Sequence, residues 1–317
     1  MNSNPFLSIV IPTYNRVDFL DYCLEVHIPL AKVHNIPIFV SDNASTDTTG
    51  EVVKRRIIEY PLIQYHRNET NLGFDGNFEC ALKYPQTDYV WLLGDTYQIP
   101  PDGIDYVLKL ITANKKKYEA IIFNVADRVI DIPQQDYTDQ NQLLSDLGWH
   151  MTCLSSLVYS SKLITNADFE RYKNTDLVQT GVIFESIANR SFLIHWVENL
   201  SVKSIKIKDL VKKSWQARTI EIWAEKWPNL ILSLPPSYKL DIKIKCIKEH
   251  GIKTQTFTLM GLLKLRSENI LNFKTYKNYS KIFPLATDLS NITILIISFL
   301  PSTILKFIRA LKKKTHV

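Results

Sequence analysis

Short apolar runs without alternation recur through the first 125 residues, and each is closed by a proline, a glycine or a polar cluster. Runs of this kind are typical of strands buried on both faces of a parallel sheet. The predicted strands cover residues 7–12, 36–40, 62–66, 89–93 and 120–124. The segments between them carry apolar residues at helical spacing, over residues 18–30, 50–60 and 78–83. Strands that alternate with helices predict an α/β fold with a mostly parallel sheet flanked by helices.

The second half of the chain has a different pattern. The mixed apolar run at 149–159 predicts a strand, and 174–189 reads as a mostly buried helix capped by Asn174 or Thr175. Residues 214–227 place their apolar side chains at amphipathic helical spacing. We therefore expect an α/β domain over residues 1–210 and a basic, mainly helical region over residues 211–317.

A strongly apolar run covers residues 292–305, and lysine-rich residues 306–314 follow it. Its uninterrupted part is shorter than the roughly 20 residues that span a bilayer, and Pro301 breaks it. An interfacial membrane anchor with a polybasic tail is the interpretation that we favour. A packed core helix and a true membrane span are the alternatives.

Charge is distributed unevenly along the chain. Residues 201–317 hold 22 Lys and Arg against 7 Asp and Glu, whereas residues 1–200 hold 16 and 25. Such asymmetry points to a polyanionic partner for the second half, either an anionic membrane surface or nucleic acid. Nucleic acid is disfavoured because no known reader motif occurs and the basic residues lie beside aliphatic runs.

Several classes of protein are excluded or disfavoured by motifs that the sequence lacks. The first strand is followed by no GxGxxG motif, and the chain has no GxxxxGK[ST] motif, so dinucleotide and P-loop chemistry are disfavoured. The N-terminus has no signal-peptide pattern. The four scattered cysteines have neither metal-ligand nor disulfide spacing, which indicates a reducing, cytoplasmic compartment. They are Cys23, Cys80, Cys153 and Cys246.

Candidate chemistry gathers after the predicted strands. Asp95 follows the strand at 89–93 directly, and open α/β sheets bind ligands at the carboxyl ends of their strands. An ordinary turn with Asp95 as a helix cap is the alternative from this stretch alone. Polar loops also follow the first two strands, so the three loops would meet at one edge of the sheet.

At this point four ordered motifs resemble the GT-A, family-2-like glycosyltransferases. They are IVIPTYN at 9–15, VSDNASTD at 40–47, NLG at 71–73 and WLLGD at 91–95. The nearest likeness is to bacterial enzymes that build O-antigen and capsule repeats, of which the abequosyltransferase-like group is one. The resemblance covers roughly residues 7–190, and it implies a GT-A, Rossmann-like catalytic domain.

The resemblance also implies roles for individual residues. Tyr14 would pack on the nucleotide base, and Asp42 would accept a hydrogen bond from a uracil-type imide. The implied donor-binding residues are Pro12, Thr13, Tyr14, Asn15, Asp42, Asn43, Asn71, Gly73, Gly94 and Asp95. Structural alternatives exist for each, since Asp42 and Asn43 also suit an Asx-turn or a helix cap and Tyr14 also suits a core.

The metal motif departs from the family pattern. Many relatives carry several aspartates where this chain has Gly94, Asp95, Thr96 and Tyr97, so both usual metal aspartates fall on non-carboxylates. Two hypotheses remain open. Either Mg²⁺ or Mn²⁺ binds weakly through Asp95 with the Thr96 hydroxyl, or the site works without metal and a basic side chain binds the donor diphosphate.

An inverting transferase needs a carboxylate that takes the proton from the attacking hydroxyl. Relatives place this base near the start of the helix predicted at 174–189, where Asp176 would lie in the first turn; Glu185 is the reserve. A purely structural role for Asp176 is the alternative, because the helix dipole favours an acid there. His150 and His195 suit a core or an acceptor cleft, and we assign neither as a base.

The sequence thus predicts an inverting glycosyltransferase, a hexosyl- or deoxyhexosyltransferase. It would move a sugar from a nucleotide-sugar donor to a polyprenyl-linked or surface-polysaccharide acceptor, in O-antigen (lipopolysaccharide) or capsule biosynthesis. It would be peripheral on the cytoplasmic face of the bacterial inner membrane. Two alternatives are a sugar nucleotidyltransferase and a non-catalytic glycan-binding subunit with a degenerate metal site.

Overall fold

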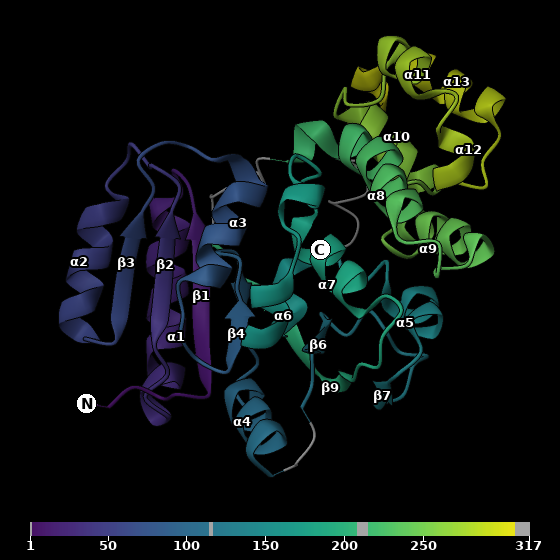
Figure 1. Ribbon diagram of the computed structural model, residues 1–317. Coiled ribbons are helices and arrows are strands. Elements are labelled where there is room, and N and C mark those ends of the chain that lie inside the picture. The colour runs from purple at the N-terminus through teal and green to yellow at the C-terminus, as the bar shows by residue number, and fades with distance from the viewer. Residues whose placement is uncertain (1, 114–116, 208–214, 308–317) are drawn as a thin grey trace. The chain divides into compact units, whose positions relative to one another are not determined.

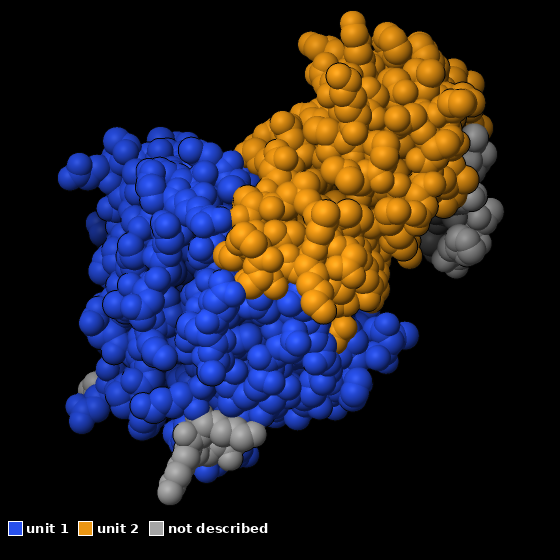
Figure 2. All heavy atoms as spheres, turned by 45° about the vertical axis from the view of Figure 1, so that its right-hand side comes forward, with its two compact units in different colours: residues 1–143, 151–210 blue, residues 144–150, 211–317 orange. Residues whose placement is uncertain are grey.

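The computed structural model describes residues 2–113, 117–207 and 215–307. The chain divides into two compact units, shown in different colours in Figure 2. Unit 1 comprises residues 1–143 and 151–210, and unit 2 comprises residues 144–150 and 211–317. The fold of each unit follows from its own pattern of apolar residues.

Unit 1 is built on a mixed, mostly parallel sheet, whose strands are drawn as arrows in Figure 1. All five predicted strands are present. The order across the sheet is β3 (Ile63–Arg67), β2 (Ile38–Asp42), β1 (Leu7–Thr13), β4 (Tyr89–Leu92), β8 (Leu157–Ser160), β6 (Ala120–Val125), β9 (Ile194–Ser204) and β5 (Tyr97–Gln98). A short strand, β7 (Gln135–Tyr137), pairs with β9.

Helices cover both faces of this sheet. Because side chains alternate between the faces of a strand, Leu7, Ile9 and Ile11 enter one core layer. That layer is closed by α1 (Val17–Val33), α2 (Thr49–Glu59) and α4 (Gly103–Ala113). The other face is covered by α3 (Gly73–Lys83), α6 (Ser161–Asn166) and α7 (Val178–Ile187), which lie toward the viewer in Figure 1.

The sheet topology brings several loops to one edge. Strands β1, β2, β3 and β4 run parallel to one another. Strand β8 is antiparallel to both β4 and β6, so β6 runs in the same direction as β4. The loops that follow β1, β2, β3, β4 and β6 therefore leave the sheet at the same edge.

The run at 149–159 is not a strand, contrary to the sequence prediction. It starts after α5 (Gln140–Leu147), passes through the short helix η1 (Leu154–Ser156) and becomes extended only in β8. Trp149 and Met151 are buried in the intervening turn. An apolar run reports burial, and its periodicity alone does not distinguish a buried strand from a buried turn.

Unit 2 is helical, as predicted for the second half of the chain. Its elements are η3 (Gln216–Arg218), η4 (Glu221–Lys226), α8 (Trp227–Ser233), α9 (Leu240–Lys253), α10 (Leu259–Ser267), α11 (Phe273–Tyr279), α12 (Phe283–Ala286) and α13 (Asn291–Phe299). The single helix predicted over 214–227 is instead a 3₁₀ turn followed by a π-helical segment, and residue 214 lies outside the described residues. Phe257, Leu262, Phe283 and Ile294 form its core.

The apolar run at 292–305 is interrupted as its sequence predicts. Helix α13 ends at Phe299, ahead of Pro301. Within the described part of the chain, no helix is both long and apolar enough to cross a bilayer. Most of the predicted polybasic tail, residues 308–314, lies outside the described residues.

Candidate active site

The loops after β1 and β2 are tied together by hydrogen bonds. The backbone N–H of Asn43 donates to the Thr13 carbonyl at 2.9 Å, and that of Asn15 donates to Ser45 Oγ at 2.9 Å. Asn15 Oδ1 accepts from the backbone N–H of Thr46 at 2.7 Å. Asn15 adopts a left-handed φ of 49°, a conformation that Asn tolerates better than most residues. The two loops thus form one continuous rim at the sheet edge.

Asn43 joins the third loop to this rim. Its Nδ2 donates to Asn71 Oδ1 at 2.8 Å and to the Gly73 carbonyl at 3.1 Å. Its Oδ1 accepts from the backbone N–H of Leu72 at 2.8 Å. Gly73 has a φ of +73°, where a side chain would be strained. The structure therefore brings Asn43, Asn71 and Gly73 together, with Asn43 organising the loops.

Asp42 is the most constrained of the predicted donor-binding residues. Its carboxylate is fully buried and accepts from Tyr65 OH at 2.6 Å, Arg67 Nη1 at 3.3 Å and the backbone N–H of Ser45 at 2.9 Å. Burial and the bond to Asp42 raise the pKa of Tyr65 to about 12. Arg67 is about half exposed and is the accessible group at this point.

Tyr14 and Thr13 have different environments although they are adjacent. Tyr14 is 41% exposed on the rim, so its ring is available to a ligand. Pro12 and Thr13 are buried, and Thr13 Oγ1 donates to Asp95 Oδ2 at 3.3 Å. Thr13 thus contributes to the site by holding Asp95.

Asp95 is buried at the centre of the loop edge, and its carboxylate binds the guanidinium group of Arg16. Arg16 Nε lies 2.9 Å from Asp95 Oδ2 and 3.1 Å from Oδ1. Burial raises the pKa of Asp95 to about 6, although Arg16 acts in the opposite direction. The preceding Gly94 donates its N–H to Ser155 Oγ at 3.0 Å, and a Cβ at Gly94 would crowd that oxygen.

These residues do not supply the ligand set that Mg²⁺ or Mn²⁺ prefers. Such cations take about six oxygen ligands, usually with more than one carboxylate. Among the residues that the structure describes, no three His, Cys, Asp or Glu side chains cluster as a metal site. Asp95 is paired with Arg16, and Thr96 and Tyr97 follow it. The donor set at this turn is therefore one engaged carboxylate and neutral hydroxyls.

Asp176 lies ahead of α7 and not in its first turn, where the sequence analysis placed it. The helix begins at Val178, and neither Asn174 nor Thr175 is its N-cap. Asp75 on α3 takes that role, because its carboxylate accepts from the backbone N–H of Asp176 at 2.8 Å and of Val178 at 3.2 Å. Asp176 has a left-handed φ of 62°. A side chain 101 residues away thus fixes the conformation of the predicted base.

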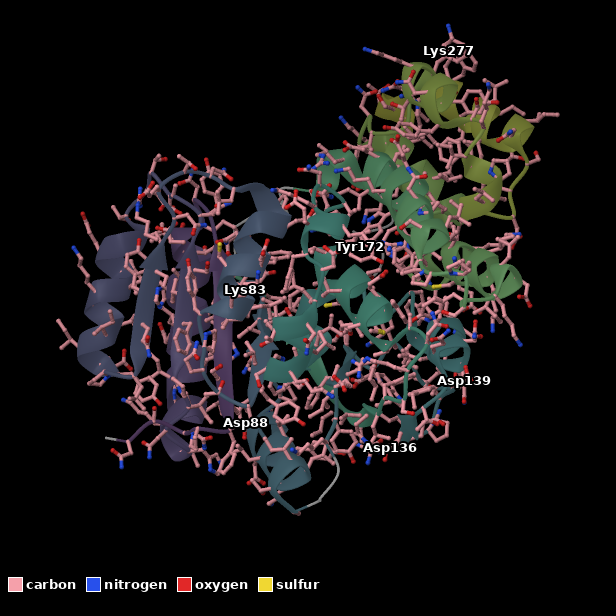
Figure 3. The ribbon with its side chains drawn as sticks, viewed as in Figure 1. Lys83, Asp88, Asp136, Asp139, Tyr172 and Lys277 are labelled. Atoms are coloured by element: carbon pink, nitrogen blue, oxygen red, sulfur yellow. The ribbon has the colours of Figure 1, made fainter. Side chains whose placement is uncertain are left out.

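Glu185 and the two histidines have structural environments. Glu185 accepts from Tyr172 OH at 2.6 Å and from Arg171 Nη1 at 3.1 Å (Tyr172 is labelled in Figure 3). His195 Nδ1 lies 2.6 Å from Asp136 Oδ1 near the first residue of β9, at the sheet edge away from the loops. His150 is buried in unit 2.

Sequence analysis missed three residues at this edge, which are Arg16, Arg67 and Asp75. Arg16 directly follows the PTYN segment, and Arg67 ends a strand at the loop edge. These positions in the sequence, next to the predicted loops, could have identified both arginines as site residues. Asp75 carried none, because its role depends on a contact with α7 that no local pattern contains.

The family model for glycosyl transferase family 2 matches residues 8–167. The chain is 38% identical to abequosyltransferase RfbV of Salmonella typhimurium over 101 residues. This matched segment is 31% of this chain and 30% of RfbV. The chain is 24% identical over 115 residues to hyaluronan synthase of Pasteurella multocida, which covers 36% of this chain and 12% of the synthase. The matched segments thus span less than a third of either relative.

Solved structures of glycosyltransferases share the fold. S. aureus TarS 1–349 in complex with UDP-GlcNAc has a TM-score of 0.59 at 16% identity, over 89% of this chain and 84% of that one. Mannosyltransferase PcManGT of Pyrobaculum calidifontis, in complex with GDP-Man and Mn²⁺, has a TM-score of 0.56 at 13% identity, over 94% and 90%. At these identities the likeness shows a GT-A fold. Because the family model covers half of its 317 residues, the chain belongs to glycosyl transferase family 2.

Proposed function

We propose that the protein is an inverting glycosyltransferase that moves a sugar from a nucleotide-sugar donor to a growing, lipid-linked surface glycan of the O-antigen or capsule type. The observation that carries the proposal is the convergence of the loops after β1, β2, β3 and β4, which are joined through Asn43, Thr13 and Asp95. The likeness to TarS with UDP-GlcNAc and to PcManGT with GDP-Man supports a nucleotide-sugar donor. The similarity to an abequosyltransferase supports a hexosyl or deoxyhexosyl group.

The donor would bind along the rim. Tyr14 offers an exposed ring for the base, and Arg67 beside Asp42 offers hydrogen-bond donors and a positive charge. Asn71 and Gly73 border the nucleoside from the third loop. This arrangement leaves the diphosphate near the turn that contains Gly94 and Asp95.

In the transfer step, the acceptor hydroxyl oxygen forms a bond to the anomeric carbon while the bond from that carbon to the diphosphate oxygen breaks. Asp176 takes the hydroxyl proton, and the nucleoside diphosphate leaves with the bonding electrons. Attack from the face opposite the leaving group inverts the anomeric centre. Asp75 is a positioning residue, because it holds the backbone of Asp176 in its left-handed conformation.

A lipid-linked acceptor requires access to a membrane surface, and unit 2 has a suitable apolar stripe. Ile292, Ile296 and Phe299 recur at helical spacing on α13 and are 58–69% exposed. Ile294 and Ile297 on the same helix are buried in the unit 2 core. The helix thus has one apolar stripe inside and one outside, and such an exposed stripe is favourable at a lipid interface.

Neighbouring side chains extend this surface. Phe273 of α11 is 47% exposed and stacks on Phe299, with ring centroids 4.9 Å apart. Lys274 and Lys277 lie on the same helix, and Lys277 is labelled in Figure 3. We define the apolar stripe of α13 together with Phe273 as the α13 surface. It supports peripheral attachment to the anionic cytoplasmic face of the inner membrane.

A panel of nucleotide sugars, incubated with the full chain and a membrane extract that contains lipid-linked acceptors, tests the proposal. Transfer of radiolabelled sugar to the organic phase from one donor supports it. A donor that raises the melting temperature without any transfer would indicate a non-catalytic binding subunit. Release of pyrophosphate from a nucleoside triphosphate and a sugar phosphate would indicate a nucleotidyltransferase. Either of these last results contradicts the proposal.

A further inference from the structure

Arg16 uses only part of its hydrogen-bonding capacity within the protein. Its Nε atom contacts both oxygens of Asp95, at 2.9 and 3.1 Å. A guanidinium group has five N–H donors, four of them on its two terminal nitrogens. No acceptor on the described residues bonds either Nη1 or Nη2 of Arg16. Four donors therefore remain for a ligand or for water.

The guanidinium group is also held in a fixed orientation. Asp95, 9% exposed in its side chain, binds one edge, and the Phe19 ring lies 4.4 Å from the central carbon on one face. Thr13 in turn donates to Asp95. The side chain of Arg16 remains 20% exposed. A preorganised guanidinium with free terminal donors matches phosphate oxygens in geometry and charge.

This group lies where the fold would otherwise place a divalent cation. Asp95 begins the turn after β4, and the two residues that follow, Thr96 and Tyr97, have no carboxylate. The carboxylate that remains is engaged with Arg16 and so does not offer both oxygens to a metal ion. The positive charge at this point of the sheet edge is thus part of the chain itself.

A second guanidinium follows β6 at the same edge. The backbone N–H of Arg128 donates to the Val125 carbonyl at 3.1 Å, so the residue turns back over the end of its strand. Its side chain is close enough to Tyr97 and Cys153 to interact with them electrostatically. Arg128 thus contributes a second positive charge within electrostatic range of Tyr97, two residues after Asp95.

We propose that Arg16, oriented by Asp95, binds the donor diphosphate in place of a divalent cation. The inference rests on the proposed function, since it concerns the donor of that reaction. Asp95 is then a positioning residue for Arg16 and not a metal ligand. The nucleoside diphosphate leaves with its negative charge stabilised by N–H donors that are fixed before the reaction begins.

Calorimetric titration of the full chain with UDP, GDP, CDP and dTDP, in EDTA and then in Mn²⁺, tests the inference without any variant. We expect one nucleotide to bind with a Kd that changes less than about twofold between the two buffers. Electron paramagnetic resonance of Mn²⁺ in the presence of that nucleotide should show no Mn²⁺ bound to the wild-type chain other than the ion that the nucleotide itself chelates. The Thr96→Asp/Tyr97→Asp variant, which restores two carboxylates, should bind Mn²⁺.

Substitutions of single arginines test which positive charge binds the diphosphate. Arg16→Ala should weaken binding of the diphosphate by about 10- to 100-fold, as expected for lost charge-assisted hydrogen bonds, and binding of the parent nucleoside by less than about twofold. Arg16→Lys should restore part of the loss. Arg55→Ala, which removes a 61% exposed arginine on α2, is the matched control and should change neither affinity.

Two different failures are distinguishable. Nucleotide binding that disappears in EDTA and returns with Mn²⁺, or equal losses for nucleoside and diphosphate in Arg16→Ala, overturns this inference and leaves the proposed function standing. If no nucleotide binds in either buffer, the proposed function fails, and the inference fails with it.

Discussion

The carboxylates at the loop edge differ in how the protein uses them. Asp42 and Asp95 are buried and bind arginines, and Asp75 is buried and binds backbone N–H groups. Each of these three holds another part of the site in place. Asp176 differs because its backbone conformation is held by one of them, Asp75.

We predict that Asp176→Asn lowers kcat by about 100-fold or more, because the amide cannot take the acceptor proton. Donor affinity should stay within about twofold, since the carboxylate acts on the acceptor side. Glu185→Gln is the matched control, because it makes the same acid-to-amide change in a group bonded to Tyr172 and Arg171. Turnover with the wild-type donor checks both. If Glu185→Gln abolishes turnover while Asp176→Asn keeps it, the assignment moves to Glu185.

Asp75→Asn tests the positioning role. The amide has one acceptor oxygen in place of two, so one of the N–H groups of Asp176 and Val178 loses its partner. We expect kcat to fall by about 10-fold, with a smaller change in donor affinity, which corresponds to one hydrogen bond of roughly 1.4 kcal/mol. If the pH dependence of kcat shifts together with this fall in kcat, the result would support a role of Asp75 that acts through Asp176. An unchanged kcat would contradict it.

Local sequence identified the polar rim but not its internal contacts. Tyr14, Asp42, Asn43 and Asp95 follow strands, so their common edge could be predicted from the strand pattern. The pairs Arg16 with Asp95 and Asp75 with Asp176 join residues 79 and 101 positions apart. No local pattern encodes such pairs, so the sequence left open whether Asp95 binds a metal ion or whether a basic side chain serves the diphosphate instead.

At the scale of elements, His27 joins α1 to Ile99, the residue directly after β5. Its Nδ1–H donates to the Cys23 carbonyl at 2.6 Å, which leaves Nε2 free to accept from the backbone N–H of Ile99 at 3.0 Å. Both contacts are buried and require a neutral ring. Burial lowers the pKa of His27 to about 4.

This pKa predicts how stability depends on pH. The unfolded chain binds a proton at His27 near pH 6.5 and the folded chain only near pH 4, so the unfolded state gains protons over that window. Stability is therefore complete above about pH 6.5 and falls as pH drops toward 4, by about 3 kcal/mol from this group. Urea unfolding from pH 7.5 to 4 measures it. His27→Gln, whose amide oxygen can still accept from Ile99, should flatten the dependence by that amount; an equally steep variant would contradict the prediction.

Gly181 permits close packing between α7 and the 3₁₀ helix η2 (Glu170–Tyr172). A Cβ at this position would lie 2.5 Å from the Tyr172 ring. Helix propensity alone favours Ala over Gly by about 1 kcal/mol, but overpacking costs about 1–3 kcal/mol. We predict a net loss of stability in Gly181→Ala, measured by denaturant unfolding, and no loss in Ser186→Ala on the same helix. A stabilised Gly181→Ala would show that Tyr172 moves aside freely.

The sequence predicted the type of an element where its apolar residues recurred with a clear period. The prediction failed where a whole segment was buried. The bounds of β1, β3, β4 and β6 differ from their predictions by no more than one residue, and those of β2 by two. Residues 149–159 did not, because a buried turn and a buried strand share the same composition. The start of α7 was misplaced because its cap comes from Asp75 on another helix.

At the scale of the whole molecule, the basic helical unit is expected to bring the enzyme to its acceptor. We predict that the full chain binds vesicles with anionic lipid at low salt, and that Ile296→Glu/Phe299→Glu weakens this binding at least about 10-fold, because two apolar side chains leave the interface. Ile58→Glu is the matched control, since Ile58 on α2 of unit 1 is 84% exposed. Vesicle flotation measures all three proteins. Equal binding of wild type and double variant would contradict a role for the α13 surface.

Composition predicted the character of unit 2 better than its detail. The excess of lysine after residue 200 and the apolar run at 292–305 indicated a basic helical region with an exposed apolar segment. Which residues of α13 face outward depended on how it packs in unit 2, where Ile294 and Ile297 enter the core. That choice is made by tertiary contacts, and the sequence alone did not contain it.

The account depends most on the neighbouring loop tips forming a single pocket for a nucleotide sugar, and calorimetry on two tyrosine variants tests this directly. Tyr14 and Tyr22 are equally exposed, at 41%, but only Tyr14 lies on the rim. With the nucleotide that binds the wild-type chain, Tyr14→Ala should weaken binding by about 10-fold, the value of one base-stacking contact, whereas Tyr22→Ala should leave it unchanged. Equal affinities for the two variants would contradict the pocket and, with it, the proposed donor site.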